Sequence, residues 1–323
     1  MKKLVGLALI AIVLAGCSND DDTEYGNWVE RSVFDGIPRS NAISFVVNNK
    51  GYMGTGYDGD DYLNDFWEYD IDGDYWVQKA DFPGKERSSA VGFATDTKGY
   101  VGIGYDGDYE LEDFWEYNPD TNTWGQKANF KGGPRRGAVG FEINGLGYIG
   151  TGYDGDNDKK DFWKYDPPTD EWSELVGFGG NKRRDAMTFE INNKIYLGTG
   201  VSNGLYVDDF WEFDPSSDNW TKLKTLNEED DYAIVRSNAV SFTIDGLGYV
   251  ATGYVNGAIS SVWAYDPILD EWEEATSFEA YPRQDAVSFY SNNKAFVLLG
   301  RSGGLYLDDS YEFLPNEEFD EDD

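Results

Sequence analysis

The eleven tryptophans of this chain fall at two recurring positions, and their spacing constrains the fold more than any other feature. The first set, spaced by 48, 48, 48, 48 and 52 residues, consists of Trp28, Trp76, Trp124, Trp172, Trp220 and Trp272. The second set consists of Trp67, Trp115, Trp163, Trp211 and Trp263, with Tyr311 in the sixth place. A period near 48 residues is typical of the blades of a β-propeller.

Each repeat is expected to form four short strands joined by tight turns. In the first repeat the strands are predicted over residues 41–47, 52–57, 65–69 and 75–79. The segment Asn48-Asn49-Lys50-Gly51 is a hairpin signal, because Asn and Gly tolerate positive φ. A sheet with aromatic residues on both faces must be covered on both sides, and radial stacking of similar sheets achieves this.

The two ends of the chain decide the number of blades. The sixth repeat ends near Tyr311-Glu312-Phe313 and lacks a tryptophan strand, whereas residues 25–30 carry Trp28 ahead of the first complete repeat. Placing this N-terminal strand on the outside of the last blade leaves no open edge in the ring. The sequence therefore predicts an all-β, six-bladed propeller over residues 25–315, closed by its N-terminal strand.

The order of motifs within each repeat resembles that of kelch repeats. Each unit has an arginine, a strand of small residues, a Gly-Tyr-x-Gly-x-Gly-like segment, an aromatic-Glu-Tyr-Asp segment and a tryptophan. The double glycine of kelch repeats is here split, as in Gly54-Thr55-Gly56. The resemblance covers residues 25–315 and implies a galactose oxidase-like propeller fold, but it carries little information about function.

The N-terminus resembles a bacterial lipoprotein leader. A short basic start and the apolar run Leu4 to Leu14, too short to span a bilayer, precede Leu14-Ala15-Gly16-Cys17. We expect a signal peptide at 1–16, acylation of Cys17, an acidic tether at 17–24 and a disordered tail at 316–323. The tether resembles export signals for the outer face of the outer membrane, so we expect a surface-exposed outer-membrane lipoprotein. A plain signal peptide with an unmodified cysteine is the alternative.

Composition excludes several classes of function. The formal net charge of −35 disfavours nucleic acid as a partner, because phosphate backbones would be repelled. The chain has no histidine and one cysteine, which excludes the copper chemistry of galactose oxidase, Ser-His triads and intramolecular disulfides. We expect a monomer whose partner is a protein or a glycan at the cell surface.

Aspartate-rich loops in the first three repeats are candidate calcium sites. Oxygen ligands beside a glycine turn suit Ca²⁺, the one cofactor that the sequence suggests. The candidate ligands are Asp58, Asp60, Asp65, Asp106, Asp108, Asp113, Asp154, Asp156 and Asp161. The alternative is a structural one: Asp-Gly turns with a solvated acidic rim, in which residues of the Asp65 type cap the third strand.

Arginines near the start of each repeat are candidate ligand-binding residues. In kelch adaptor domains of ubiquitin ligases, which this arrangement resembles, the corresponding arginines hold acidic peptides at the propeller mouth. The carry-over falls on Arg39, Arg87, Arg136, Arg184, Arg236 and Arg283, to which the sixth repeat adds Arg301 and Tyr306. The alternative is that each arginine bonds a carbonyl or carboxylate within the fold, since a role repeated in every blade is more often structural.

Three functions remain open from the sequence. The first is a non-enzymatic binding module for a protein or glycan. The second is a sugar mutarotase resembling kelch-type N-acetylneuraminate epimerases, which would use Arg283, Arg301 and a carboxylate such as Asp285. The third is a surface scaffold stiffened by calcium. A single asymmetric cluster of buried charges in the channel favours the enzyme, and charged residues spread evenly around the rim favour binding.

Overall fold

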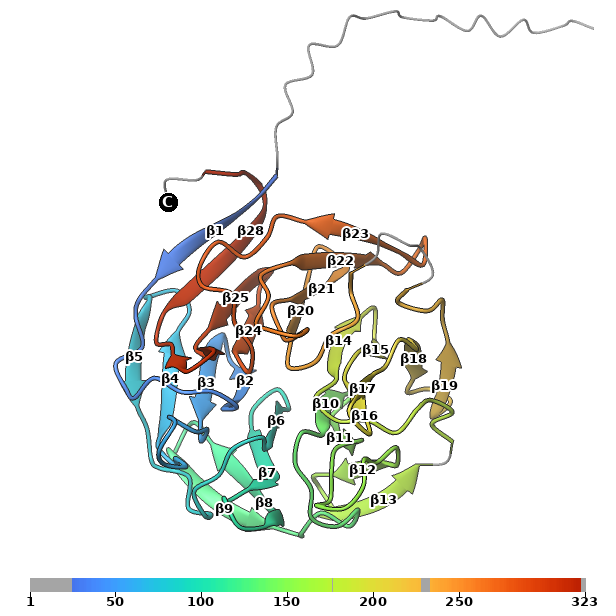
Figure 1. The fold of residues 1–323 in the computed structure, drawn as a ribbon. Helices are drawn as coiled ribbons and strands as arrows, with labels where there is room; N and C mark the ends of the chain where they lie inside the picture. The colour runs from blue at the N-terminus through green and yellow to red at the C-terminus, as the bar shows by residue number, and fades with distance from the viewer. Residues whose placement is uncertain (1–24, 176, 228–232, 321–323) are drawn as a thin grey trace, which may run out of the picture.

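The computed structural model describes residues 25–175, 177–227 and 233–320. The predicted leader 1–16, Cys17 and the tether 17–24 lie outside these residues. The chain forms six four-stranded antiparallel sheets, which are arranged around a central axis (Figure 1), so the predicted all-β six-bladed propeller is confirmed. In the described part of the chain, no helix is long and apolar enough to cross a membrane.

The first three blades follow the order of the chain. Blade one consists of β2 (Ile43–Val47), β3 (Lys50–Gly54), β4 (Phe66–Asp70) and β5 (Tyr75–Gln78). Blade two consists of β6 (Val91–Ala94), β7 (Gly99–Tyr105), β8 (Glu110–Asn118) and β9 (Thr123–Lys127). Blade three consists of β10 (Val139–Ile143), β11 (Leu146–Gly150), β12 (Phe162–Asp166) and β13 (Glu171–Leu175). In each blade the first strand lies nearest the axis (Figure 1).

Of the remaining blades, four and six each add a short hairpin to the four strands. Blade four consists of β14 (Met187–Ile191), β15 (Lys194–Gly198), β18 (Trp211–Asp214) and β19 (Asn219–Lys222), with the hairpin β16 (Val201–Ser202) and β17 (Leu205–Tyr206). Blade five consists of β20 (Val240–Ile244), β21 (Leu247–Ala251), β22 (Val262–Asp266) and β23 (Glu271–Ala275). Blade six consists of β24 (Val287–Ser291), β25 (Lys294–Leu298), β28 (Ser310–Glu318) and β1 (Tyr25–Arg31), with the hairpin β26 (Arg301–Ser302) and β27 (Leu305–Tyr306).

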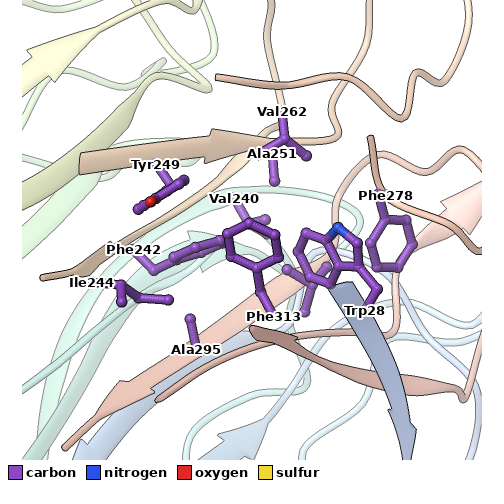
Figure 2. Packing of buried hydrophobic residues seen from close by; sticks show 11 residues of the cluster. Trp28, Val240, Phe242, Ile244, Tyr249, Ala251, Val262, Phe278, Ala295 and Phe313 are labelled. Carbon is purple, nitrogen blue, oxygen red and sulfur yellow. The ribbon is translucent and has the colours of Figure 1, made fainter. Parts of the chain in front are cut away.

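The N-terminal strand closes the ring, as predicted. β1 pairs antiparallel with β28, and Trp28 lies opposite Phe313. The Trp28 side chain is fully buried and packs between Phe278 and Phe313, as Figure 2 shows. β28 continues to Glu318, which lies opposite Tyr25 of β1, so the first residues of the segment predicted as a disordered tail, 316–318, belong to this strand.

Aromatic side chains fill the space between blades. In blade one the rings of Phe45 and Tyr52 stack with centroids 5.4 Å apart, and Phe66 stacks on Tyr52 at 5.8 Å. The second strand supplies a glycine where the neighbouring blade presents its phenylalanine: a Cβ at Gly51 would lie 2.6 Å from the ring of Phe289. Glycine and aromatic positions therefore recur together, because each ring needs a small residue opposite it.

Candidate functional site

One arginine in every blade is buried and bonds to other parts of the same blade; we call it the clasp arginine. These fully buried arginines are Arg39, Arg87, Arg135, Arg183, Arg236 and Arg283. In blade two, the Arg87 Nη1 and Nη2 groups donate to the two carboxylate oxygens of Asp113 at 2.7 and 2.8 Å. Nη1 also donates to the Ile103 carbonyl at 2.9 Å, and the guanidinium lies 4.8 Å from the ring of Phe82. The clasp joins the start of the blade to its second and third strands.

The structure divides the predicted arginines into two groups. Arg39, Arg87, Arg236 and Arg283 are clasps with no exposed surface, so they do not reach the mouth of the propeller. Arg136 and Arg184 each follow a clasp, Arg135 or Arg183, and do line a pocket at the mouth. Arg135 and Arg183 lie one and two 48-residue repeats after Arg87, whereas Arg136 and Arg184 lie one residue further along. This spacing could have separated the two groups in the sequence.

Six of the nine predicted calcium ligands accept hydrogen bonds from other groups of the protein. Asp65, Asp113 and Asp161 accept from the clasp arginines of their blades. Burial alone would raise the pKa of Asp113, but the hydrogen bonds and charge of Arg87 outweigh it and lower that pKa. Among the described residues, no group of three or more acidic, cysteine or histidine side chains is placed to hold a metal ion.

The other loop aspartates shape turns. The Oδ1 atom of Asp58 accepts the backbone N–H groups of Asp60 and Asp61 at 2.9 and 2.7 Å. Asp106 and Asp154 make the same pair of bonds in blades two and three. Asp60, Asp108 and Asp156 are among the exposed residues of these turns. The arrangement matches the structural alternative of Asp-Gly turns with a solvated rim.

Blade five departs from the clasp pattern. Here Ser261 stands where other blades have aspartate, and Arg236 Nη2 donates to its hydroxyl at 3.0 Å. Burial lowers the pKa of Arg236 to about 10. The carbonyls of Thr252 and Ser261 accept from Nη1, both at 2.8 Å. Backbone and hydroxyl groups thus replace the carboxylate, which marks blade five as different from its neighbours.

A closed ring of backbone hydrogen bonds forms the floor of the mouth. The residue two positions after each clasp arginine has a φ between 50° and 58° and donates its N–H to the carbonyl of the equivalent residue in the neighbouring blade. The six N···O distances run from 2.8 to 3.2 Å. The ring residues are Asn41, Ser89, Gly137, Asp185, Asn238 and Asp285. Asn, Asp and Gly suit this left-handed backbone, which explains most of these identities.

A pocket of about 760 Å³ stands on this floor. Three arginines line it: Arg136, Arg184 and Arg301, whose side chains are 34%, 30% and 35% exposed. In the described part of the chain, their Nη2 groups donate no hydrogen bond. Each therefore keeps hydrogen-bond donors that no described residue uses.

These three arginines break the sixfold symmetry. Arg136 and Arg184 occupy a position that holds Ser or Gln in the other blades, namely Ser40, Ser88, Ser237 and Gln284. Arg301 occupies the position of Tyr57, Tyr105, Tyr153, Val201 and Tyr254. Tyr306, predicted beside Arg301, pairs with it across the hairpin β26–β27. Because these positions depart from a pattern that the other blades repeat, they are the candidates for a dedicated site.

Two aspartates of the floor differ in their surroundings. Asp285 accepts from Asn238 at 2.6 Å, from Gln284 at 2.8 Å and from Arg301 Nε at 2.8 Å. Asp185 lies 3.4 Å from Arg184 Nε, beside Gly137, where an added Cβ would collide with its carboxylate. Burial, together with the negative charge of Asp285, raises the pKa of Asp185 to about 7. The pocket thus holds one carboxylate that is paired with an arginine and two amides, and one whose pKa is raised to about 7.

Comparison with known proteins supports the fold alone. No family model and no curated protein matches the sequence. A solved structure described as "Structure of YjhT" matches with a TM-score of 0.76 at 19% sequence identity, covering 86% of this chain and 95% of that one. The chain therefore shares the six-bladed propeller fold of YjhT, a kelch-repeat protein.

Proposed function

We propose that this protein is a surface-anchored binding module that holds a carboxylate-bearing sugar of a glycan in the mouth pocket. The observation that carries the proposal is the gathering of Arg136, Arg184 and Arg301 around one cavity at positions where the other blades have no arginine. Guanidinium groups pair with carboxylates in a planar, two-pronged geometry. In a chain of net charge −35, such a cationic cluster is a local exception.

The mixture of donors and acceptors favours a sugar over an acidic peptide. The lining combines three arginines with Asp185, Asp285 and neutral donors such as Asn238. Hydroxyl groups of a sugar both donate and accept hydrogen bonds, so they can use the aspartates and the amides together. An acidic peptide would meet repulsion from these aspartates and from the acidic rim.

The anchor is a second part of the proposal. It depends on the leader pattern ending at Cys17, which precedes the described residues. Acylation there would hold the propeller at the outer membrane with its mouth accessible to glycans. Fractionation of cells that produce the Cys17→Ser variant tests this, since the variant should leave the membrane fraction.

Binding of acidic sugars should depend on Arg136. Arg136→Ser gives blade three the residue that Ser40, Ser88 and Ser237 provide in other blades, so the variant should fold normally. Loss of a charge-assisted contact worth about 1.5–3 kcal/mol should weaken binding about 10- to 100-fold. Calorimetric titration with N-acetylneuraminic acid, D-glucuronic acid and D-galacturonic acid measures this, with D-glucose as the neutral ligand.

The matched control is Lys85→Ser, which removes an exposed cation on a rim loop outside the pocket. It should bind like the wild type. Equal affinity of the wild type and Arg136→Ser for every acidic sugar would contradict the proposed site. The absence of binding by the wild type at millimolar concentrations would contradict the proposed function.

A mutarotase is the second candidate, because Asp185 and Asp285 are suited to act as acid and base. A base would take the proton of the anomeric hydroxyl while the acid protonates the ring oxygen. The ring C–O bond then breaks as a carbonyl forms, and closure on the other face reverses these transfers. Two carboxyl groups that line one cavity, one of them with a raised pKa, are suited to such proton transfer.

Asp185→Asn tests this candidate, since Asn41 and Asn238 hold the same backbone conformation in blades one and five. Loss of an acid–base group should slow interconversion of N-acetylneuraminic acid anomers at least about 100-fold. If protonated Asp185 is the acid, the wild-type rate should fall as pH rises through about 7. Proton NMR of a freshly dissolved single anomer measures the rate. Equal rates for the wild type and Asp185→Asn would contradict the mutarotase and leave the binding module as the only proposed function.

A further inference from the structure

The loop of blade five that runs from Tyr254 to Ala258, after the second strand, is shorter than the equivalent loop of the other blades. Across this loop Tyr254 pairs with Ala258, four residues later, whereas Tyr57 pairs with Tyr62, five residues later. Ala258 thus stands where the other blades carry larger side chains, namely Tyr62, Glu110, Asp158, Tyr206 and Tyr306. Blade five is one residue shorter here and lacks a bulky group.

Those larger side chains close the gap to the next blade. The ring of Tyr306 lies 6.1 Å from that of Tyr57, and the ring of Tyr62 lies 5.9 Å from that of Tyr105. Asp158 accepts from Arg184 Nη1 at 2.6 Å. A methyl group cannot span this distance, and a Cβ at Gly257 would meet no atom within 4 Å. The mouth pocket is therefore open at its side beside blade five.

Tyr254 lies beside this opening, and its ring is free to contact a ligand. It lines the pocket and is 38% exposed. The hydroxyls of Tyr57, Tyr105 and Tyr153, at the equivalent position, donate to a glycine carbonyl two residues on, at 2.6, 2.5 and 2.6 Å. In blade five that place is taken by Asn256, and within the described residues the Tyr254 side chain makes no hydrogen bond or ring contact.

We propose that Tyr254, Gly257 and Ala258 form a second subsite, which stacks the next sugar ring of an acidic oligosaccharide. This inference rests on the proposed function, with the terminal carboxylated sugar among Arg136, Arg184 and Arg301. An aromatic face attracts the positively polarised C–H groups of a sugar ring. The cavity of about 760 Å³ also lies in the upper part of the range, about 300–1,000 Å³, of sites that bury drug-sized ligands. The ligand class is thus an oligosaccharide that ends in an acidic sugar.

Calorimetry with paired ligands tests the subsite. The pairs are N-acetylneuraminic acid with 3′-sialyllactose, and D-glucuronic acid with its β1,3-linked N-acetylgalactosamine disaccharide. The wild type should bind the longer member of at least one pair about 5- to 10-fold more tightly, as expected for one stacking contact. Tyr254→Val, which gives blade five the residue of Val201, should abolish that advantage by weakening the longer ligand at least about 5-fold more than the single sugar.

Two comparisons separate the possible failures. Tyr109→Ala removes a tyrosine that is 69% exposed on the equivalent loop of blade two, and this variant should behave like the wild type. Equal affinity of the wild type for short and long ligands, or equal weakening of both by Tyr254→Val, overturns the subsite while the arginine pocket stands. Binding of neither ligand to the wild type overturns the subsite together with the proposed function.

Discussion

Replacing Trp28 with alanine is expected to lower the free energy of unfolding by about 3–5 kcal/mol, the usual cost of removing a buried tryptophan. The side chain has no exposed surface, and its ring centroid lies 4.8 Å from that of Phe278 and 4.6 Å from that of Phe313 (Figure 2). These contacts join the two ends of the chain, because β1 and β28 belong to the same blade. Urea unfolding monitored by circular dichroism measures the change.

The control for this variant lies on the same strand. Tyr25 is exposed, so Tyr25→Ala should change the free energy of unfolding by no more than about 0.5 kcal/mol. If Trp28→Ala destabilises the protein no more than Tyr25→Ala does, closure by the N-terminal strand does not contribute to stability.

Replacing Arg87 with leucine is expected to cost about 3 kcal/mol, the lower end of the range for breaking a buried ion pair. The variant leaves Asp113 without its guanidinium and the carbonyls of Lys85 and Ile103 without a donor. Asp113 retains some exposure, which moderates the loss. Arg136→Ser, at the mouth, should have a much smaller effect on unfolding.

The difference in the free energy of unfolding between the wild type and Arg87→Leu should change with pH in a definite direction. The pKa of Asp113 is lowered in the folded protein, so its stabilisation is present above the unfolded value near 4 and is lost as pH falls below it. The gap between the wild type and Arg87→Leu should therefore narrow below about pH 4. A gap that stays constant down to pH 2 would show that the ion pair is not its source.

The repeat made the fold predictable from the sequence. Tryptophans at a constant step gave the number of blades, and the missing tryptophan of the sixth repeat gave the closing strand. The same step also linked each clasp to its carboxylate: Arg39 to Asp65, Arg87 to Asp113, Arg135 to Asp161, Arg183 to Asp209 and Arg283 to Asp309 are all 26 residues apart. That regularity favours a structural role for Asp65, Asp113 and Asp161 over calcium binding.

The mouth pocket was less predictable, for a physical reason. In Arg135-Arg136 and Arg183-Arg184 two adjacent arginines point to different surroundings, and an error of one residue exchanges a buried clasp for a lining side chain. The pocket also joins residues from several blades, whose approach depends on closure of the ring. Only the departures from the repeat, such as Arg301 in a tyrosine position, indicated it in the sequence.

The floor of the pocket has an electrostatic consequence of its own. Its six N–H groups donate in one rotational sense around a closed circle, from Asn41 to Asp285 and onward through every blade. Peptide dipoles aligned along an axis add up, as in a helix, but dipoles arranged head to tail around a circle cancel. These six peptide groups therefore offer an anion no net attraction along the channel. The positive charge that lines this mouth is that of Arg136, Arg184 and Arg301.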